Sequence, residues 1–236
     1  MRIRFIFARK MPLAHISHLD MLRLFLRALR RSGLPLAYSQ GFNPHPRFTL
    51  ALPLPLGLTA GEEYGEVFFT KDILPDQFIE ELTVQLPEAL VITGAFSADM
   101  EAPSLASLVS AALYRAVPRS DSGIAFKPEK LQSALDRLMA EEKILIQRKT
   151  KKSKITSINV RPYILEVSVN NFEIKRPGIK MLLQAGSQGG VSPAFVIEQL
   201  EPEFGAGRLH AYDWQIHRDR LYLKKNGILQ PLSEGM

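Results

Sequence analysis

Hydrophobic and polar residues follow two different periods in the first 47 residues of the chain. From Arg2 to Phe7 basic and apolar residues alternate, which predicts a strand with one buried face. From His18 to Arg31 apolar residues recur at helical spacing. Ser17 is placed to cap this helix, and Gly33 follows it as a C′ residue would. The leucines that we expect to face the core are Leu19, Leu22, Leu26 and Leu29.

Turn-forming and apolar stretches alternate through the rest of the first half. Gly41, Pro44 and Pro46 predict a loop over residues 39–47. Strands are expected over 35–38, 48–56, 65–69 and 90–93, and a helix over 74–86. With the paired stretches 48–56 and 65–69 counted as one element after the short strand 35–38, the order is strand, helix, strand, strand, helix, strand, which is that of a ferredoxin-like unit.

The second half repeats this rhythm. Periodicity predicts helices over 128–141 and 193–200 and strands over 108–117, 163–169, 180–184, 210–215 and 220–223. We therefore expect an α+β protein of two tandem ferredoxin-like (βαββαβ) units with antiparallel sheets. The boundary is expected just after the acidic segment, which gives domains 1–102 and 103–236.

Composition narrows the class of protein. The 236 residues include no cysteine, which excludes disulfides, thiolate catalysis and an iron–sulfur cluster held by thiolates of this chain. No apolar run is long enough for a membrane span, and the first residues do not resemble a secretory signal. We expect a cytoplasmic protein without a cofactor of its own.

Charge is unevenly distributed along the chain, with a net value of +6. Residues 1–47 carry nine Lys/Arg and one acid, and residues 143–161 carry seven Lys/Arg and none. Residues 72–101 carry seven acids and no Lys or Arg. Two basic zones separated by an acidic one indicate a surface that faces a polyanion such as RNA.

Three of the five histidines, His15, His18 and His45, lie in one polar stretch over residues 15–47. Three interpretations of it are open. Histidines and Asp20 are possible ligands of a metal, but their spacing matches no established pattern, and we expect none. They are also suited to cap the helix and bond to the 39–47 loop. The third interpretation is an RNA or anion site, in which arginines neutralise phosphates and aromatic rings stack on bases. Its candidate residues in this stretch are His18, Asp20, Arg23, Arg27, Tyr38, Ser39, Gln40, Phe42, Asn43, His45 and Arg47.

The topology of a ferredoxin-like unit predicts how this stretch is arranged. If the second strand ends before residue 39, the loop after it leaves the sheet where the first helix begins. We therefore expect His18, Asp20, Ser39, Asn43 and His45 to converge on one concave surface. Arg23, Arg27 and Arg47 would lie at its rim. A carboxylate close to two imidazoles would favour their charged forms.

A second basic run follows residue 147. It is either a solvated loop or a phosphate clamp with a salt-dependent affinity. Its candidate contacts are Arg148, Lys149, Lys151 and Lys152.

Three motifs in this sequence resemble those of the radical SAM-linked proteins. They are His15-Ile16-Ser17-His18-Leu19-Asp20, the stretch from Arg27 to Pro35, and Tyr38-Ser39-Gln40-Gly41-Phe42-Asn43-Pro44-His45-Pro46. Leu56-Gly57, Gly61-Glu62 and Arg161-Pro162 continue the resemblance, which adds Arg161 to the candidate RNA contacts. The family usually has an acid shortly before the last pair, where this chain has Asn159. The resemblance implies a radical SAM enzyme as partner and points to RNA, but it supplies no catalytic residue.

The leading hypothesis is therefore an accessory module that presents tRNA or rRNA to a radical SAM enzyme. An alternative is a metal-independent endoribonuclease, because CRISPR repeat-processing endoribonucleases resemble this layout. His15, His18 or His45 would then act as general acid or base, since histidine titrates near neutral pH. A further alternative is a protein-interaction scaffold that docks a basic partner on the acidic segment 72–101.

Overall fold

Residues 1–110 and 217–236 form one compact unit of the chain, and residues 111–216 form a second. The computed structural model describes residues 1–122, 127–149, 155–173, 176–200, 204 and 210–236. The last twenty residues thus belong to the first unit, whereas the sequence assigned them to a domain over 103–236.

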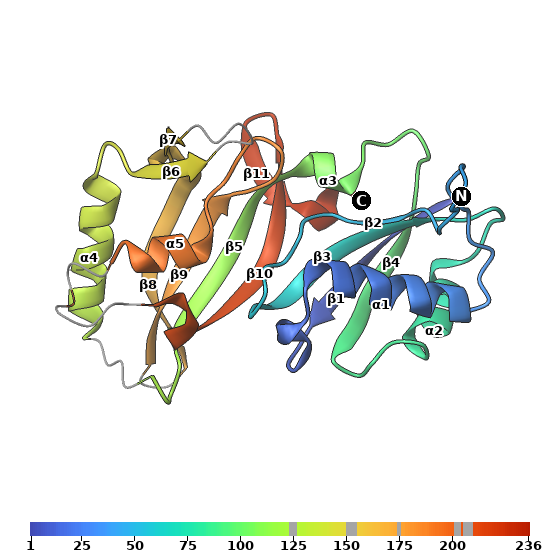
Figure 1. Ribbon diagram of the computed structural model, residues 1–236, viewed down its shortest axis with the longest axis horizontal. Helices are drawn as coiled ribbons and strands as arrows, with labels where there is room; N and C mark the ends of the chain where they lie inside the picture. Colours follow the sequence, from blue (N-terminus) through green and yellow to red (C-terminus); the bar gives the residue numbers. More distant parts are fainter. Residues whose placement is uncertain (123–126, 150–154, 174–175, 201–203, 205–209) are drawn as a thin grey trace. The chain divides into compact units, whose positions relative to one another are not determined.

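The first unit is built on a mostly antiparallel sheet (Figure 1). Strand β1 (Arg2–Arg9) lies between β3 (Thr59–Phe68) and β4 (Leu90–Ala98), antiparallel to both. The short β2 (Phe48–Leu50) pairs with the last residues of β3. Strand β10 (Trp214–Lys225) pairs in parallel with the first two residues of β3, and it pairs antiparallel with β11 (Ile228–Pro231). The C-terminal segment therefore extends a sheet that the N-terminal residues begin.

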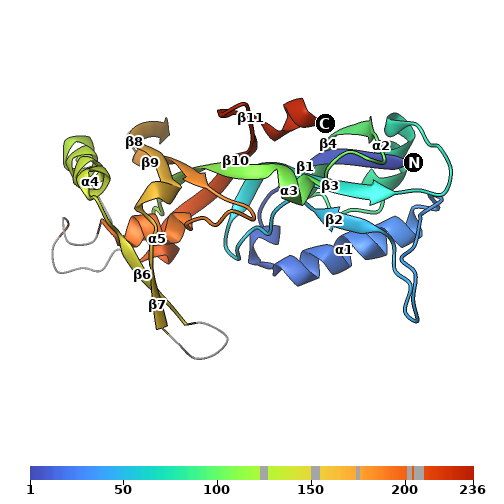
Figure 2. The ribbon, with the colours of Figure 1, turned by 90° about the horizontal axis from the view of Figure 1, so that it is seen from above.

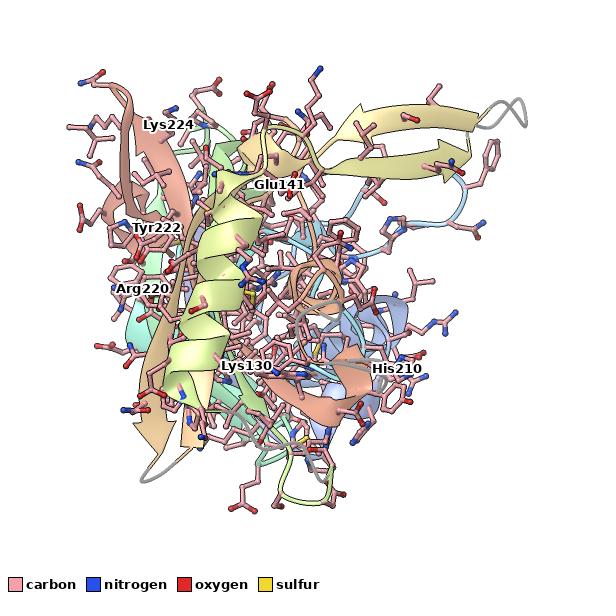
Figure 3. All side chains as sticks on the ribbon, turned by 90° about the vertical axis from the view of Figure 1, so that its left-hand side faces the viewer. Lys130, Glu141, His210, Arg220, Tyr222 and Lys224 are labelled. Atoms are coloured by element: carbon pink, nitrogen blue, oxygen red, sulfur yellow. The ribbon has the colours of Figure 1, made fainter. Side chains whose placement is uncertain are left out.

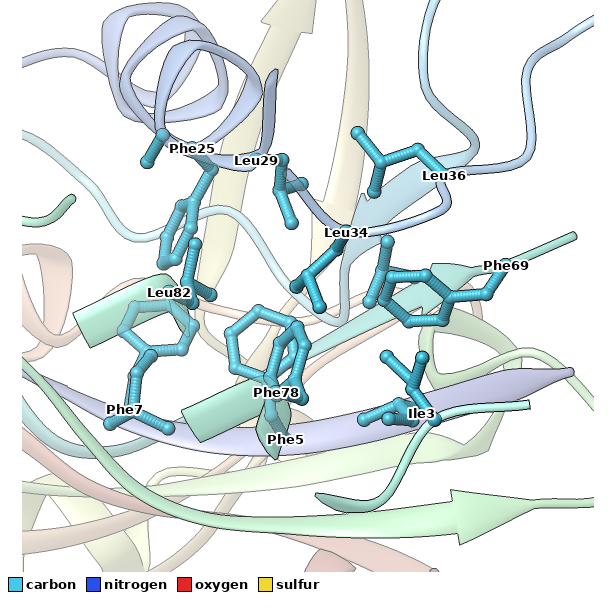
Figure 4. Close-up of a cluster of buried hydrophobic side chains, with 14 of the residues drawn as sticks. Ile3, Phe5, Phe7, Phe25, Leu29, Leu34, Leu36, Phe69, Phe78 and Leu82 are labelled. Carbon is cyan, nitrogen blue, oxygen red and sulfur yellow. The ribbon is translucent and has the colours of Figure 1, made fainter. Parts of the chain in front are cut away.

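Helices α1 (His18–Arg31) and α2 (Pro75–Thr83) cover one face of this sheet and enclose the core of the unit (Figure 4). Ser17 caps α1, because its hydroxyl accepts a hydrogen bond from the Asp20 amide. The ring of Phe25 lies 5.0–5.6 Å from those of Phe5 and Phe7. The side chains of α1 that are buried are Met21, Phe25, Ala28 and Leu29. The prediction that Leu19 faces the core was wrong, because this register leaves it 62 % exposed.

Gly65 of β3 leaves space for an aromatic ring of β1. A Cβ at this position would lie 2.5 Å from Phe5 Cζ, which is closer than any packed side chain tolerates. We expect Gly65→Ala to lower the free energy of unfolding by about 1–3 kcal/mol, because the ring must move in a packed core. Gly94→Ala in β4 is the matched control, since its Cβ would make ordinary contacts at 3.5 Å. Urea denaturation of both variants measures the difference, and equal stabilities would contradict the expectation.

The second unit has a three-stranded antiparallel sheet in the order β5-β9-β8. These strands are β5 (Val109–Pro118), β8 (Ile164–Glu173) and β9 (Arg176–Gln184). Helix α4 (Pro128–Ala140) packs on β8, and α5 (Pro193–Glu198) begins at Ser192, which caps it as the sequence indicates. A separate two-stranded hairpin of β6 (Leu145–Lys149) and β7 (Ile155–Asn159) extends away from α4 (Figure 3).

The structure confirms a mixed α+β fold dominated by a mostly antiparallel sheet, while the tandem ferredoxin-like description stays a prediction. Helices α1 and α4 lie within one residue of their expected bounds. The β6–β7 hairpin, the short α3 (Leu105–Leu108) and β11 were not expected, and 210–225 forms one strand after a turn instead of two strands. Among the described residues, no helix combines the length and the apolar character that crossing a membrane requires.

Candidate nucleic-acid interface

Residues 38–47 form a hairpin, which we call the 38–47 hairpin. Its base is joined to β3, because the Ala37 amide donates to the Phe68 carbonyl at 2.8 Å and the Arg47 amide donates to the Ala37 carbonyl at 2.8 Å. Ser39 and His45 then pair through a backbone bond of 2.9 Å and a bond from the His45 amide to the Ser39 hydroxyl. The two segments hold the tip, residues 40–44, away from the sheet.

The side chains of the 38–47 hairpin are aromatic and polar, and most are exposed. Phe42 at the tip is fully exposed and Tyr38 is 46 % exposed. The Arg47 guanidinium lies 4.0 Å from the centre of the Phe68 ring, which orients it by a cation–π contact. His45 Nδ1 lies 3.0 Å from the Asn43 carbonyl. Phe42 and Tyr38 thus place two exposed aromatic rings on the same hairpin as His45 and Arg47.

The outer face of α1 is basic and lies close to this hairpin. Arg23, Arg27 and Arg30 are exposed on it. Figures 1 and 2 show the hairpin at the C-terminal end of α1, on the side of the sheet that α1 covers. Arg30 is therefore at the hairpin end of the helix and Arg23 is towards its start. Arg23 also forms an exposed ion pair with Asp20 at 3.0 Å.

The structure does not bring His18 and Asp20 to the hairpin, so the predicted convergence of the two motifs was wrong. His18 is the first residue of α1. It lies close to Arg9, the last residue of β1, which donates a hydrogen bond to the Ile16 carbonyl. The hairpin is joined to Phe68, which pairs with Arg2 at the other end of β1. Seven residues of strand separate these ends by about 23 Å. The prediction failed because it placed the second strand before the loop 39–47, whereas β2 follows that loop.

His18 lies half-buried at the start of α1, and its surroundings oppose protonation. Burial lowers the pKa of the imidazole, and the positive charges of Arg218 and Arg9 lower it further. The expectation that carboxylates favour a charged His18 is therefore wrong. Asp20 instead accepts a hydrogen bond from the Ser17 hydroxyl at 2.7 Å, which together with Arg23 lowers the pKa of its carboxyl. This geometry fits the capping interpretation of Asp20.

The lowered pKa of His18 predicts a pH dependence of stability. The unfolded chain binds a proton on this side chain near pH 6.5, and the folded protein binds it less tightly. Unfolding therefore takes up a proton as pH falls through that value, and stability falls until pH is below the folded pKa. We expect His18→Asn to lose less stability than the native protein between about pH 7.5 and pH 5. Urea denaturation at both pH values measures this, with His45→Asn as control; parallel losses in all three proteins would refute it.

A buried ionic cluster beneath the start of α1 was missed from the sequence. Arg218 of β10 donates two hydrogen bonds to the Glu63 carboxylate of β3, one of them from Nε at 2.6 Å. It also donates to the carbonyls of Leu52 and Pro53. Arg9 donates to the carbonyls of the turn before α1. Each of the three charged side chains is at least 95 % buried. A signal for it in the sequence is the arginine in β1 and in β10, Arg9 and Arg218, at positions where alternation predicts an apolar residue.

The remaining candidates lie in the second unit. Arg161 donates twice to the Met139 carbonyl and once to that of Ile164, so it supports the end of α4 and does not point to a ligand. The Asn159 side chain accepts from the amides of Ile144 and Arg161, which a carboxylate also could do. Arg148 and Lys149 lie in β6, but their side chains fall outside the described residues, as do Lys151 and Lys152 entirely. His15 is exposed in a short turn of the first unit. Across the described ranges, no three His, Asp or Glu side chains are grouped as metal ligands would be.

The fold and the hairpin define an α+β protein with an exposed, basic and aromatic element next to a basic helix. The chain belongs to the family described as "Uncharacterized protein conserved in bacteria (DUF2344)", whose model matches residues 2–193. No curated protein matches the sequence. Among solved structures, a chain of the crystal structure of a Cbf5-Nop10-Gar1 complex is similar at 12 % identity and a TM-score of 0.45. The match covers 92 % of this chain and 49 % of that one.

Proposed function

We propose that this protein binds RNA through the 38–47 hairpin and the outer face of α1. The observation that carries the proposal is Phe42, a fully exposed ring at the tip of a hairpin that also presents Tyr38, His45 and Arg47. Such a ring offers an unpaired base a stacking surface, and arginines beside it neutralise the adjacent phosphates.

The same geometry favours single-stranded or looped RNA over a regular duplex. A ring at a hairpin tip reaches bases that are unstacked, whereas the deep major groove of an RNA duplex excludes side chains. Arg27 and Arg30 are exposed on α1, whereas Arg47 stacks on Phe68, whose ring lies with Arg2 on the other face of the sheet. In this proposal the RNA bends around the 38–47 hairpin and so reaches all three arginines. In this proposal Arg23 is secondary, because its guanidinium already pairs with Asp20.

The proposal includes a partner enzyme. The resemblance to radical SAM-linked proteins implies that a radical SAM enzyme acts on the bound RNA, in the cytoplasm. Because this chain has no cysteine, thiolates for such a cluster come from another polypeptide. The role proposed for this chain is to hold tRNA or rRNA for that enzyme.

We also propose that the first unit is a ferredoxin-like unit in which the 38–47 hairpin is an insertion before β2. The order β4-β1-β3, with β2 on β3 and both helices on one face, supports this assignment. The hairpin would then be an addition to a common scaffold, which is where binding elements are usually carried.

A fluorescence titration with labelled single-stranded and stem-loop RNA tests the binding proposal. With about three phosphate contacts on a single strand, the slope of log affinity against log salt is roughly −2, so affinity falls about 20-fold between 50 mM and 200 mM salt. Absence of binding at low salt, or an affinity that does not change with salt, would overturn it. Denaturing gels of the same mixtures detect cleavage, and fragments that disappear in His45→Ala would favour the endoribonuclease.

A further inference from the structure

Strand β4 forms an open edge of the sheet in the first unit. Its residues pair with β1 on one side, and within the described chain the other side of 91–98 receives no backbone hydrogen bond. In an antiparallel strand every second residue directs both its N–H and its C=O to the same side. Alternate residues of the nine-residue β4 therefore present donors and acceptors to an added strand.

This edge has a bulge at Thr93, but it lacks the other protection that natural edges usually carry, and residues 94–98 pair regularly with β1. Its sequence, Leu90 to Ala98, contains no charged residue and no proline. Three other outer strands of the same sheet differ, because β2 and β11 have only three and four residues and β8 carries Glu166. Short strands and charged side chains are the common means of preventing strand addition. The long, uncharged edge of β4 therefore resembles the exposed sheet edges to which an extended peptide adds as a further strand.

The surroundings of this edge are acidic. Helix α2 packs beside β4, and Asp76 and Glu80 lie one turn apart on it, exposed. Glu88 precedes the strand, while Asp99 and Glu101 follow it, and all are exposed. From residue 72 to 101 the chain has seven acids and no Lys or Arg. Two copies of this edge would repel one another, whereas a basic segment would be attracted.

We propose that β4 docks an extended, lysine- or arginine-rich segment of a partner protein as an additional antiparallel or parallel strand. Backbone hydrogen bonds to the free side of β4 supply the affinity, and the acids at both ends select the charge of the partner. Phe96, which is 43 % exposed and lies opposite Arg4, offers a surface for an apolar side chain of the added strand. This surface and the 38–47 hairpin involve different residues, so the RNA proposal can fail while this one holds.

A fluorescein-labelled peptide of alternating lysine and valine, about as long as β4, tests the site by fluorescence anisotropy in the absence of RNA. The same peptide with glutamate in place of lysine is the charge control. We expect binding of the lysine peptide only, together with slower hydrogen exchange in residues 90–98 when it is bound. Equal binding of both peptides, or unchanged exchange in this strand, would overturn the proposal.

Two substitutions separate the edge from general electrostatics. Thr93 and Ser97 are exposed on β4, so the double variant Thr93→Lys/Ser97→Lys protects the edge without disturbing the core. We expect it to weaken peptide binding at least about tenfold, because it places cations along the docking strand. Gln77→Lys adds a cation to α2 without changing the edge, and should weaken binding no more than about twofold. Normal peptide binding by the double variant would contradict the site. If the native protein is a dimer and Thr93→Lys makes it a monomer, a second copy of this chain occupies the edge instead.

Discussion

Glu63→Gln is expected to lower the free energy of unfolding by about 3–5 kcal/mol, because it removes the charge of one partner of a buried ion pair. Glu63 is 4 % exposed, and it is the carboxylate that faces the buried guanidinium of Arg218. Its charge also stabilises the charged form of Arg9, whose pKa is lowered by burial. Removing the negative charge takes from these two buried guanidinium groups the carboxylate that stabilises their charged forms. Urea denaturation at neutral pH measures the loss.

The neighbouring glutamate supplies the control. Glu62 pairs with Arg220 at 2.7 Å, but both side chains are about a third exposed. Solvent screens such a pair, so Glu62→Gln should change stability by no more than about 1 kcal/mol. Glu63→Leu combined with Arg218→Met should recover part of the loss, because it removes a cation together with its partner. Similar losses from Glu62→Gln and Glu63→Gln would show that burial does not decide the contribution of these pairs.

Phe42→Ala is expected to weaken RNA binding by about 1–3 kcal/mol, or roughly 5- to 150-fold, without changing stability. The ring contacts water and no core residue, so its removal leaves the fold intact. Loss of affinity would then report the loss of one stacked base. The titration is made at a fixed low salt concentration, with thermal unfolding of the same samples as a check.

Phe96→Ala is the matched control for this prediction, since it removes a partly exposed ring from the same unit. It should bind RNA like the native protein. Arg47→Ala should also weaken binding, and it should make the dependence on salt less steep because one phosphate contact is lost. An unchanged affinity of Phe42→Ala would show that the hairpin is not the RNA contact.

The parts of the fold that could be predicted are those with local signals. The bounds of α1 follow from Ser17 as cap and Gly33 after the last turn, and α5 follows from Ser192 and Pro193. Capping and turn chemistry act over a few residues, so a single sequence contains them. For the same reason the polar 38–47 segment stood out as a candidate binding element before its geometry was known.

The features that could not be predicted depend on residues distant in the chain. The pairing of β10 with β3 joins residues 59 and 217, and no local pattern encodes it. The buried face of α1 was also predicted wrongly at Leu19. The helix has apolar residues on two overlapping faces, and the face that packs on the sheet is the one with Met21 and Phe25. The position of the 38–47 hairpin was misplaced for a similar reason, since a three-residue β2 after the loop sets the direction of the chain.

The return of residues 217–236 to the first unit has a consequence for how the protein is made. During translation Glu63 is synthesised long before Arg218, so the nascent first unit has only Arg9 beside this carboxylate until residue 218 has emerged. At typical rates of about 5–20 residues per second, the intervening 155 positions take on the order of ten seconds. Ribosomes that stop before residue 218 therefore release chains that lack both the buried partner of Glu63 and the strand that pairs with the start of β3.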